Sequence, residues 1–275
     1  MSKNDIQPAS FSDFLYWINE RHRIFLMRMG GADKPWSKDP IFQQWKFTNV
    51  YRQLDTGTIW LQKILKDQTN LKLIIFNVMW YRLFNWWEHA KNLRFIKSHG
   101  KLERYINQRF AESKQIFTSA HMTTGVSGEF KFQSYLRACK EAWDQRKFVL
   151  SICKFDSMEA VFYKLLQFFM VGKFVGYEMV CDLRFTNVLD AVDTLTWANV
   201  GPGAERGLRR LGMDPTLESM RELLSRKNEL QSYVFDCEWP FELREIEHSL
   251  CEFDKYQRVK TGAGRPRQRY NGGAE

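Results

Sequence analysis

The chain has 275 residues and a hydrophobic content of 44%, which is enough for one large domain or two small ones with a sizeable core and argues against a disordered chain. Its net charge of +9 favours a polyanionic partner, nucleic acid first and an anionic membrane surface second. No apolar run reaches the roughly 18 residues that a membrane span needs, and the N-terminal "MSKNDIQPASFSDF" lacks the apolar core of a secretory signal.

The first part of the chain has the hydrophobic pattern of helices. Residues 10–29 carry apolar side chains at helical spacing, and Ser10 or Ser12 is available as an N-cap. The glycines and prolines of residues 30–40 predict a loop. We expect a long helix over residues 41–65, bent near Gly57, and an unusually aromatic helix over residues 70–96.

The second part continues in the same way. Residues 101–117 form an amphipathic helical pattern, and residues 121–132 read as a glycine-containing loop. Residues 157–185 predict one or two helices, interrupted around Gly172 and Gly176. Neither an internal repeat nor the period-two alternation of strands is evident. The predicted fold class is therefore all-α, with one catalytic domain over residues 1–257, in one body or two lobes, and a flexible basic tail over residues 258–275.

Cysteine and histidine residues show no metal-ligand spacing. The cysteines are odd in number and scattered, which is typical of reduced thiols in a cytoplasmic protein. We therefore expect no metal site and no cofactor. The residues concerned are Cys139, Cys153, Cys181, Cys237, Cys251, His22, His89, His99, His121 and His248.

The stretch "LTWANVGPGAERGLRRLG" has the pattern of a helix-hairpin-helix near residues 190–212. An apolar helix end would precede Gly201 and Gly203, and a second helix would begin near Ala204. Glycine lets a phosphate oxygen approach the backbone, and the N–H groups of the next helix favour that anion. The stretch therefore predicts binding to the DNA backbone without dependence on the DNA sequence. The alternative is a plain turn between two helices with glycine caps. The residues expected to contact phosphates are Gly201, Gly203, Arg206, Arg209 and Arg210.

The C-terminal tail is rich in arginine and glycine and poor in apolar residues. We expect it to add DNA affinity through counterion release while taking no part in the chemistry. Its DNA-binding residues are predicted to be Lys260, Arg265, Arg267 and Arg269.

Two expected helices carry polar side chains that a core does not need. In "WKFTNVYRQLD", Asn49 and Arg52 recur at helical spacing with Asp55 beside them, and in "FNVMWYRLFNWWE" Asn77 begins a polar line. Buried amides and charges are costly unless they are paired. These residues are therefore either ties between helices or the lining of a pocket that suits a flipped nucleobase and its phosphate.

Three blocks, "WKFTNVYRQLD", "WANVGPGAERGL" and "IEHSLCEFDKY", resemble a phage family. It is the α-glutamyl/putrescinyl thymine pyrophosphorylase family, which includes the amino acid:DNA transferases of thymidine hypermodification, and the resemblance spans roughly residues 35–270. The resemblance implies an all-helical fold related to helix-hairpin-helix DNA glycosylases. It also implies duplex DNA with a phosphorylated 5-hydroxymethyluracil as one substrate and an amino acid or polyamine as the other, with phosphate or pyrophosphate released in the cytoplasm of the infected cell.

That chemistry needs cations for the leaving phosphate, a base for the attacking ammonium, and amides for the edges of the nucleobase. A solvated helix face is the alternative for the acidic stretch from Glu247 to Lys255. The candidates are Arg52, Arg82 and Lys255 as cations, Asp55, Glu252 and Asp254 as bases, and Asn49 and Asn77 as amides.

Three other functions stay open. No G-x-x-x-x-G-K-[ST] loop is present, so the sequence does not support a P-loop kinase activity, although the helical domain of a 5-hydroxymethyluridine DNA kinase system is an alternative. A lysine-dependent glycosylase is disfavoured because no lysine follows the glycines at once. A non-catalytic DNA-binding module would need the basic segments but not the cluster of Asn49, Arg52 and Asp55.

Overall fold

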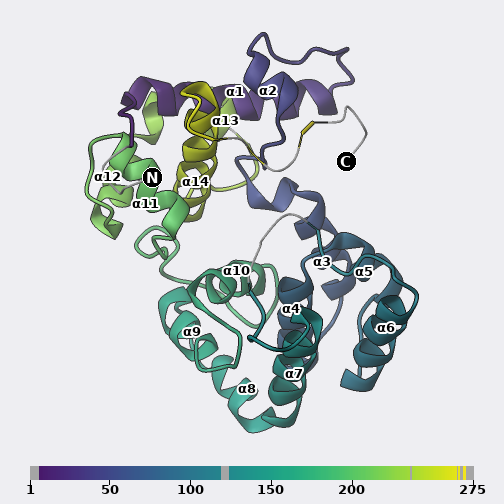
Figure 1. The fold of residues 1–275 in the computed structure, drawn as a ribbon. Helices are drawn as coiled ribbons and strands as arrows, with labels where there is room; N and C mark the ends of the chain where they lie inside the picture. Colours follow the sequence, from purple (N-terminus) through teal and green to yellow (C-terminus); the bar gives the residue numbers. More distant parts are fainter. Residues whose placement is uncertain (1–5, 119–123, 236, 265, 267–268, 271–275) are drawn as a thin grey trace. The chain divides into compact units, whose positions relative to one another are not determined.

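The computed structural model describes residues 6–118, 124–235, 237–264, 266 and 269–270, apart from the side chains of residues 146–148. Within them the chain is all-helical: the one β-type pairing is an isolated bridge between Trp45 and Arg269, so the predicted fold class is confirmed. Figure 1 shows the helices, which form two compact units. Unit 1 comprises Met1–Asp55 and Thr194–Glu275, and unit 2 comprises Thr56–Asp193.

Unit 1 is built from the two ends of the chain. Its α-helices pack around the last of them, α14, which contacts α1, α2, α11 and α12. The elements are α1 (Phe11–Met29), α2 (Pro40–Gln44), the 3-10 helix η1 (Arg52–Leu54), α11 (Pro202–Arg210), α12 (Leu217–Ser225), the 3-10 helix η2 (Lys227–Glu229), α13 (Ser232–Phe235) and α14 (Leu243–Lys260).

Unit 2 is a bundle around α4, which packs against α3, α5, α7, α8 and α10. Every residue of α4 from Ile74 to Phe84 is buried, which explains its apolar and aromatic sequence. The elements are α3 (Thr56–Leu65), α4 (Leu71–Phe84), α5 (Trp87–Leu93), α6 (His99–Ala111), α7 (Lys131–Asp144), α8 (Arg146–Ile152), α9 (Met158–Leu165) and α10 (Lys173–Leu183).

The first predicted helix is confirmed, with Ser10 as its N-cap. The Ser10 hydroxyl accepts the backbone N–H of Asp13, and the Asp13 carboxylate accepts the backbone N–H of Ser10. The apolar face of α1 buries Phe14, Trp17 and Ile18, and the Phe14 ring meets Phe253 of α14 edge-on at 5.3 Å. The apolar face that the helical spacing predicts therefore packs into the core of unit 1.

The long helix predicted over residues 41–65 is wrong. The chain is helical in α2 and again in α3, but residues 45–50 between them are not. Buried Arg21 of α1 donates its Nε to the carbonyl oxygens of Phe47 and Thr48, at 3.3 and 2.8 Å. These carbonyls would otherwise accept the N–H groups of the next helical turn, so a tertiary contact replaces the local helix.

The remaining helices follow the hydrophobic pattern, with one break. The helix expected over residues 70–96 divides into α4 and α5 at Asn85, which takes the left-handed conformation (φ +44°) that asparagine tolerates. The region of residues 157–185 forms two helices, as one of the two alternatives predicted. Gly172 is the N-cap of the second, whereas Gly176 lies inside it, close to the side chains of Phe162 and Leu166.

The predicted helix-hairpin-helix is wrong because its first helix is missing. No helix is present between Leu183 and Pro202. In unit 2, Asp193 instead caps α9 by accepting the backbone N–H groups of Met158 and Glu159. In unit 1, the Thr196 carbonyl accepts the Arg221 guanidinium at 3.0 Å. Side-chain and backbone groups on this segment are thus committed to other elements.

The glycines of this stretch serve helix packing. In unit 1, α11 and α14 lie side by side (Figure 1), and a Cβ added at Gly203 would lie 2.2 Å from Cys251 Sγ. A Cβ at Gly207 would lie 2.5 Å from the Leu250 carbonyl oxygen. Glycine at both positions therefore allows the two helix backbones to approach closely.

Because His22 is buried, we expect the stability of unit 1 to fall at acidic pH. Its ring is 1% exposed among Phe25, Tyr51 and Tyr233, and burial lowers its pKa from 6.5 to about 4. As the pH falls from 6.5 toward 4, the unfolded chain binds a proton that the folded chain does not, so the free energy of unfolding falls.

Urea unfolding at pH 7 and at pH 4 tests this effect. Between pH 7 and pH 4, the free energy of unfolding should fall by roughly 3 kcal/mol less in His22→Phe than in wild type. A pKa lowered from 6.5 to about 4 corresponds to about that much free energy. His89 of unit 2, whose pKa burial also lowers to about 4, is common to both proteins and cancels in the comparison. Equal losses in the two proteins would contradict the prediction.

Candidate functional site

The extended segment of residues 45–55 carries the polar groups of the candidate site. Arg21 of α1 helps to fix this segment, because its Nη2 also donates to Asn49 Oδ1 at 2.6 Å. Asn49 is buried and donates its Nδ2 to the Leu54 carbonyl at 2.9 Å and to Asp55 Oδ1 at 3.0 Å. The backbone N–H of Asn49 also donates to Asp55 Oδ1, at 2.9 Å. These bonds close residues 49–55 into a loop that orients the Asp55 carboxylate.

The second oxygen of Asp55 faces His248 of α14. His248 Nε2 lies 3.8 Å from Asp55 Oδ2, and the two side chains are 17% and 23% exposed. Loss of hydration raises the pKa of Asp55, against the opposing effects of His248, the Asn49 N–H and two arginines. A partly exposed carboxylate with a raised pKa is a stronger proton acceptor than a carboxylate at its ordinary pKa.

Glu252 lies one turn further along α14 and is held in the ionised form. Its Oε2 accepts the Thr48 backbone N–H at 3.0 Å and lies 2.5 Å from Lys255 Nζ. Burial acts to raise the pKa of Glu252, but Lys255 and His248 outweigh it and the net pKa is lowered. The environments of Asp55 and Glu252 therefore push the two pKa values apart, a pattern that is typical of acid–base sites.

Four of the predicted catalytic residues therefore converge in unit 1: Asn49, Asp55, Glu252 and Lys255. Arg52 lies beside them in η1, buried with a 4% exposed fraction, and contributes positive charge that lowers the pKa of Asp55. The convergence comes from the loop and α14 and not from the helical face that the sequence predicted. We call Asn49, Asp55, His248, Glu252 and Lys255 the Asp55 cluster.

Two predicted catalytic residues lie in unit 2, where they tie helices together. Asn77 is fully buried and uses its whole amide: Nδ2 donates to the carbonyls of Leu73 and Ile96, and Oδ1 accepts the Trp80 indole and the Ile96 N–H. Arg82 forms a buried bidentate pair with Asp182. The contacts favour the alternative of a structural tie over a lined pocket for both residues.

Asp254, predicted as a base, is instead the centre of an ion-pair network. It is fully buried, and its oxygens lie 2.8 Å from Arg206 Nε, 2.8 Å from Arg210 Nε and 3.3 Å from Arg258 Nε. Arg210 is itself 4% exposed. The network joins α11 to α14, and the Nε atoms of Arg206 and Arg210 pair with a carboxylate of their own chain.

The other residues predicted to bind DNA occupy different places. Arg209 is exposed on α11. Lys260 closes the last turn of α14 and lies 2.8 Å from Asp13, so it belongs to a helix and not to a mobile tail. Arg269 is exposed, pairs its backbone with Trp45 and lies over the Trp45 ring at 5.4 Å. Arg265 and Arg267 lie outside the described residues, and Gly201 and Gly203 face α14.

Sequence reasoning missed Arg21 and His248. One signal was available for His248, since His248, Glu252 and Lys255 recur at intervals of four and three residues and share one face of α14. Arg21 gave no such signal, because it shares α1 with several other basic residues and its burial follows from the loop that it holds. Burial raises the pKa of the Cys251 thiol, which disfavours the reactive thiolate form.

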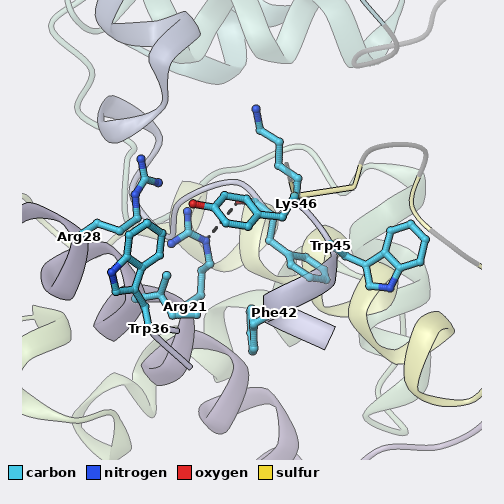
Figure 2. A pocket seen from close by; sticks show the side chains of 9 residues that line it. Arg21, Arg28, Trp36, Phe42, Trp45 and Lys46 are labelled. Carbon is cyan, nitrogen blue, oxygen red and sulfur yellow. Dashed lines mark hydrogen bonds between the residues drawn. The ribbon is translucent and has the colours of Figure 1, made fainter. Parts of the chain in front are cut away.

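A half-open hollow lies in unit 1 beside Trp45, Lys46 and Phe47. Figure 2 shows Arg28 and Trp36 along one part of its wall and Trp45 along another. The lining combines basic and aromatic side chains, and none of the lining residues is acidic: Arg21, Ile24, Arg28, Trp36, Phe42, Trp45, Lys46, Phe47 and Tyr270. We call it the aromatic pocket.

Neither a metal-binding cluster nor a membrane-spanning helix occurs in the described part of the chain. It contains no group of three or more His, Cys, Asp or Glu side chains placed to hold a metal ion. None of its helices combines the length and apolarity that crossing a bilayer requires.

Comparison with known proteins identifies the family. Residues 8–265 match the family model described as "5-hmdU DNA kinase, helical domain". The chain belongs to this family. The resemblance to the transferase family therefore holds only at a coarse level, as a phage thymine-modification protein, since the matched family is that of the kinase-associated helical domain.

A curated relative agrees with the family model. The 5-hmdU DNA kinase of Bacillus phage SP10 is 26% identical over 281 residues, which cover 88% of this chain and 44% of the relative. The chain thus spans less than half the length of that kinase. No solved structure matches the chain. The Asp55 cluster and the aromatic pocket are the two candidate sites that we consider in the described part of unit 1.

Proposed function

We propose that this chain is the helical module of a phage enzyme that modifies 5-hydroxymethyluracil in DNA, and that Asp55 accepts the proton of the attacking group. The Asp55 cluster is the observation that carries the proposal: a partly exposed carboxylate with a raised pKa, oriented by Asn49 and faced by His248. The family match over residues 8–265 supports the substrate, and the net charge of +9 supports a polyanionic partner.

Phosphoryl transfer to the base is the reaction that the family match favours. The 5-hydroxymethyl oxygen attacks the terminal phosphoryl group of a nucleoside triphosphate, and the bond to the bridging oxygen breaks so that the diphosphate leaves. The hydroxyl proton has to leave as the new P–O bond forms. A positioned carboxylate accepts that proton, which is the role we assign to Asp55. The chain contains no G-x-x-x-x-G-K-[ST] loop, so we assign to it the modified base and the proton transfer but not a P-loop site for the phosphate donor.

Amine transfer is the second candidate, and the block "WKFTNVYRQLD" that resembles the transferase family favours it. In this reaction an amino acid or polyamine attacks the methylene of an already phosphorylated base, and phosphate or pyrophosphate leaves. The attacking ammonium first loses a proton, so the same carboxylate serves both reactions. Lys255 and Arg52 supply positive charge beside it.

The test compares duplexes that differ only in one base. Fluorescence anisotropy measures the affinity of the chain for a duplex containing 5-hydroxymethyluracil and for the same duplex containing thymine. Nucleoside mass spectrometry then follows two reactions: the hydroxymethyl duplex with ATP and a separate kinase domain that supplies the phosphate-donor site, and the phosphorylated duplex with a panel of amino acids and polyamines. We expect tighter binding of the hydroxymethyl duplex and a product in one of the two reactions. Equal affinities together with no product in either reaction would overturn the proposal.

A further inference from the structure

We infer that the aromatic pocket binds one nucleotide unit, with the nucleobase against its tryptophan rings and the phosphate beside its cations. The inference deepens the proposed function and rests on it in one respect, that DNA is the expected source of the nucleotide. The shared chemistry of the ligand is a planar base that carries a phosphate. A free nucleotide has the same chemistry and is tested as the other source.

The aromatic side chains provide stacking surfaces at the edge of unit 1. Trp36 and Trp45 are partly exposed, and Figure 2 shows them on different parts of the wall. The Trp36 indole donates to the Ala32 carbonyl at 2.7 Å, which fixes its ring in the loop of residues 30–39. A base that stacks on an aromatic side chain gains about 1–3 kcal/mol whatever its identity, because every base has a π-face.

Positive charge surrounds these rings. The Arg28 guanidinium lies 5.4 Å and the Lys34 ammonium 5.0 Å from the centre of the Trp36 ring. Lys46 is exposed, and Figure 2 shows its ammonium and the Arg28 guanidinium pointing to the same side of the pocket. With no carboxylate in the described lining, the pocket favours an anion, and a phosphate attached to a stacked base would lie beside these cations.

The pocket is joined to the Asp55 cluster through the residues between them. Arg21 lines the pocket and donates to Asn49, which holds Asp55. Phe47 also lines the pocket, and its ring lies under the Lys255 ammonium at 4.9 Å. Because the hollow is half-open, a nucleotide lies along its wall while the rest of a DNA strand continues into solvent.

Binding of a short single-stranded thymidine oligonucleotide, measured by fluorescence anisotropy, tests the inference. We expect Trp36→Ala and Trp45→Ala each to weaken binding by about ten- to a hundredfold, in line with the loss of one stacked base. Trp36→Phe keeps a ring at the position and should keep most of the affinity. The matched control is Tyr163→Ala, which removes an exposed aromatic side chain from unit 2.

Three further probes identify the source and the contacts. Arg28→Gln and Lys46→Gln should each reduce the salt dependence of binding by about one counterion. An abasic oligonucleotide should bind as weakly as the tryptophan variants. Thymidine 5′-monophosphate and ATP, added as competitors, show whether a free nucleotide enters the same pocket.

The inference is overturned if both tryptophan variants bind like wild type, or if the abasic oligonucleotide binds as tightly as the normal one. Its failure is distinct from failure of the proposed function. The pocket is judged by affinity alone, whereas the proposed function is judged by the preference for 5-hydroxymethyluracil and by product formation. A protein with unchanged affinity in the tryptophan variants but with product would retain its function and lose this pocket.

Discussion

Replacement of Asp254 by alanine is expected to lower the free energy of unfolding by about 3–5 kcal/mol, the usual effect of removing one partner from a buried ion pair. The fully buried carboxylate lies within 3.3 Å of three arginines, and Arg210 is as deeply buried as a core residue. Without Asp254, the Arg210 guanidinium stays in the interior with no carboxylate at its Nε. Urea unfolding followed by circular dichroism measures the loss.

A surface ion pair provides the control for this measurement. Asp144 lies 2.5 Å from Lys140, and both side chains are more than half exposed, so Asp144→Ala should change stability by no more than about 1 kcal/mol. The double variant Arg210→Met with Asp254→Leu should recover much of the loss, because it removes both buried charges together. A loss below about 1 kcal/mol in Asp254→Ala would contradict the structural role and return Asp254 to the candidate bases.

Asp55→Asn is expected to reduce product formation by roughly a hundred- to ten-thousandfold, the range for loss of a general base. Asparagine keeps an oxygen at the position of Oδ1, which accepts both N–H groups of Asn49, so the loop should stay folded. Affinity for DNA and the melting temperature should therefore remain close to those of wild type. Single-turnover mass spectrometry, with thermal melting of the same samples, separates the chemical effect from a structural one.

The pH profile of the same reaction adds a second readout. A base acts only when it is ionised, so the rate should rise with pH through the raised pKa of Asp55 and then level off. The asparagine variant should lose this rise. Glu112→Gln, a change at an exposed carboxylate of unit 2, is the control and should behave like wild type. Full turnover in Asp55→Asn would place the proton acceptor elsewhere, with His248 as the next residue to test.

Hydrophobic periodicity predicted most helices because it reports which face of a segment is buried. It succeeded for α1, where capping and the apolar face are both local properties of residues 10–29. It failed for residues 45–55, whose backbone is held by Arg21 and Glu252 from distant parts of the chain. A pattern of residue types cannot reveal a partner that lies 27 or 204 positions away.

The candidate site was predicted in part for the same reason. Asn49 and Asp55 were identified as costly polar residues in an aromatic segment, and they do lie together. The same reasoning chose Asn77 and Asp254, whose polar atoms are satisfied within the protein. A polar side chain whose atoms are all paired inside the protein has a structural role, whereas one that keeps an exposed polar atom can serve a functional site. The sequence shows the residue type but not the partner of each side chain. The glycines near residue 203 illustrate this point, since a close helix contact and a phosphate contact require the same residue.

In the sequence, unit 2 is inserted between the two segments of unit 1, and this arrangement sets the order in which the two units can fold. Unit 2 is one continuous segment, so it can complete its core as soon as residue 193 has left the ribosome. Unit 1 joins residues that are more than two hundred positions apart, as in the bond from Thr48 to Glu252. Its central helix α14 is synthesised near the end. Until then the apolar face of α1 has no partner in α14, which makes unit 1 the part of the nascent protein that depends on protection from aggregation.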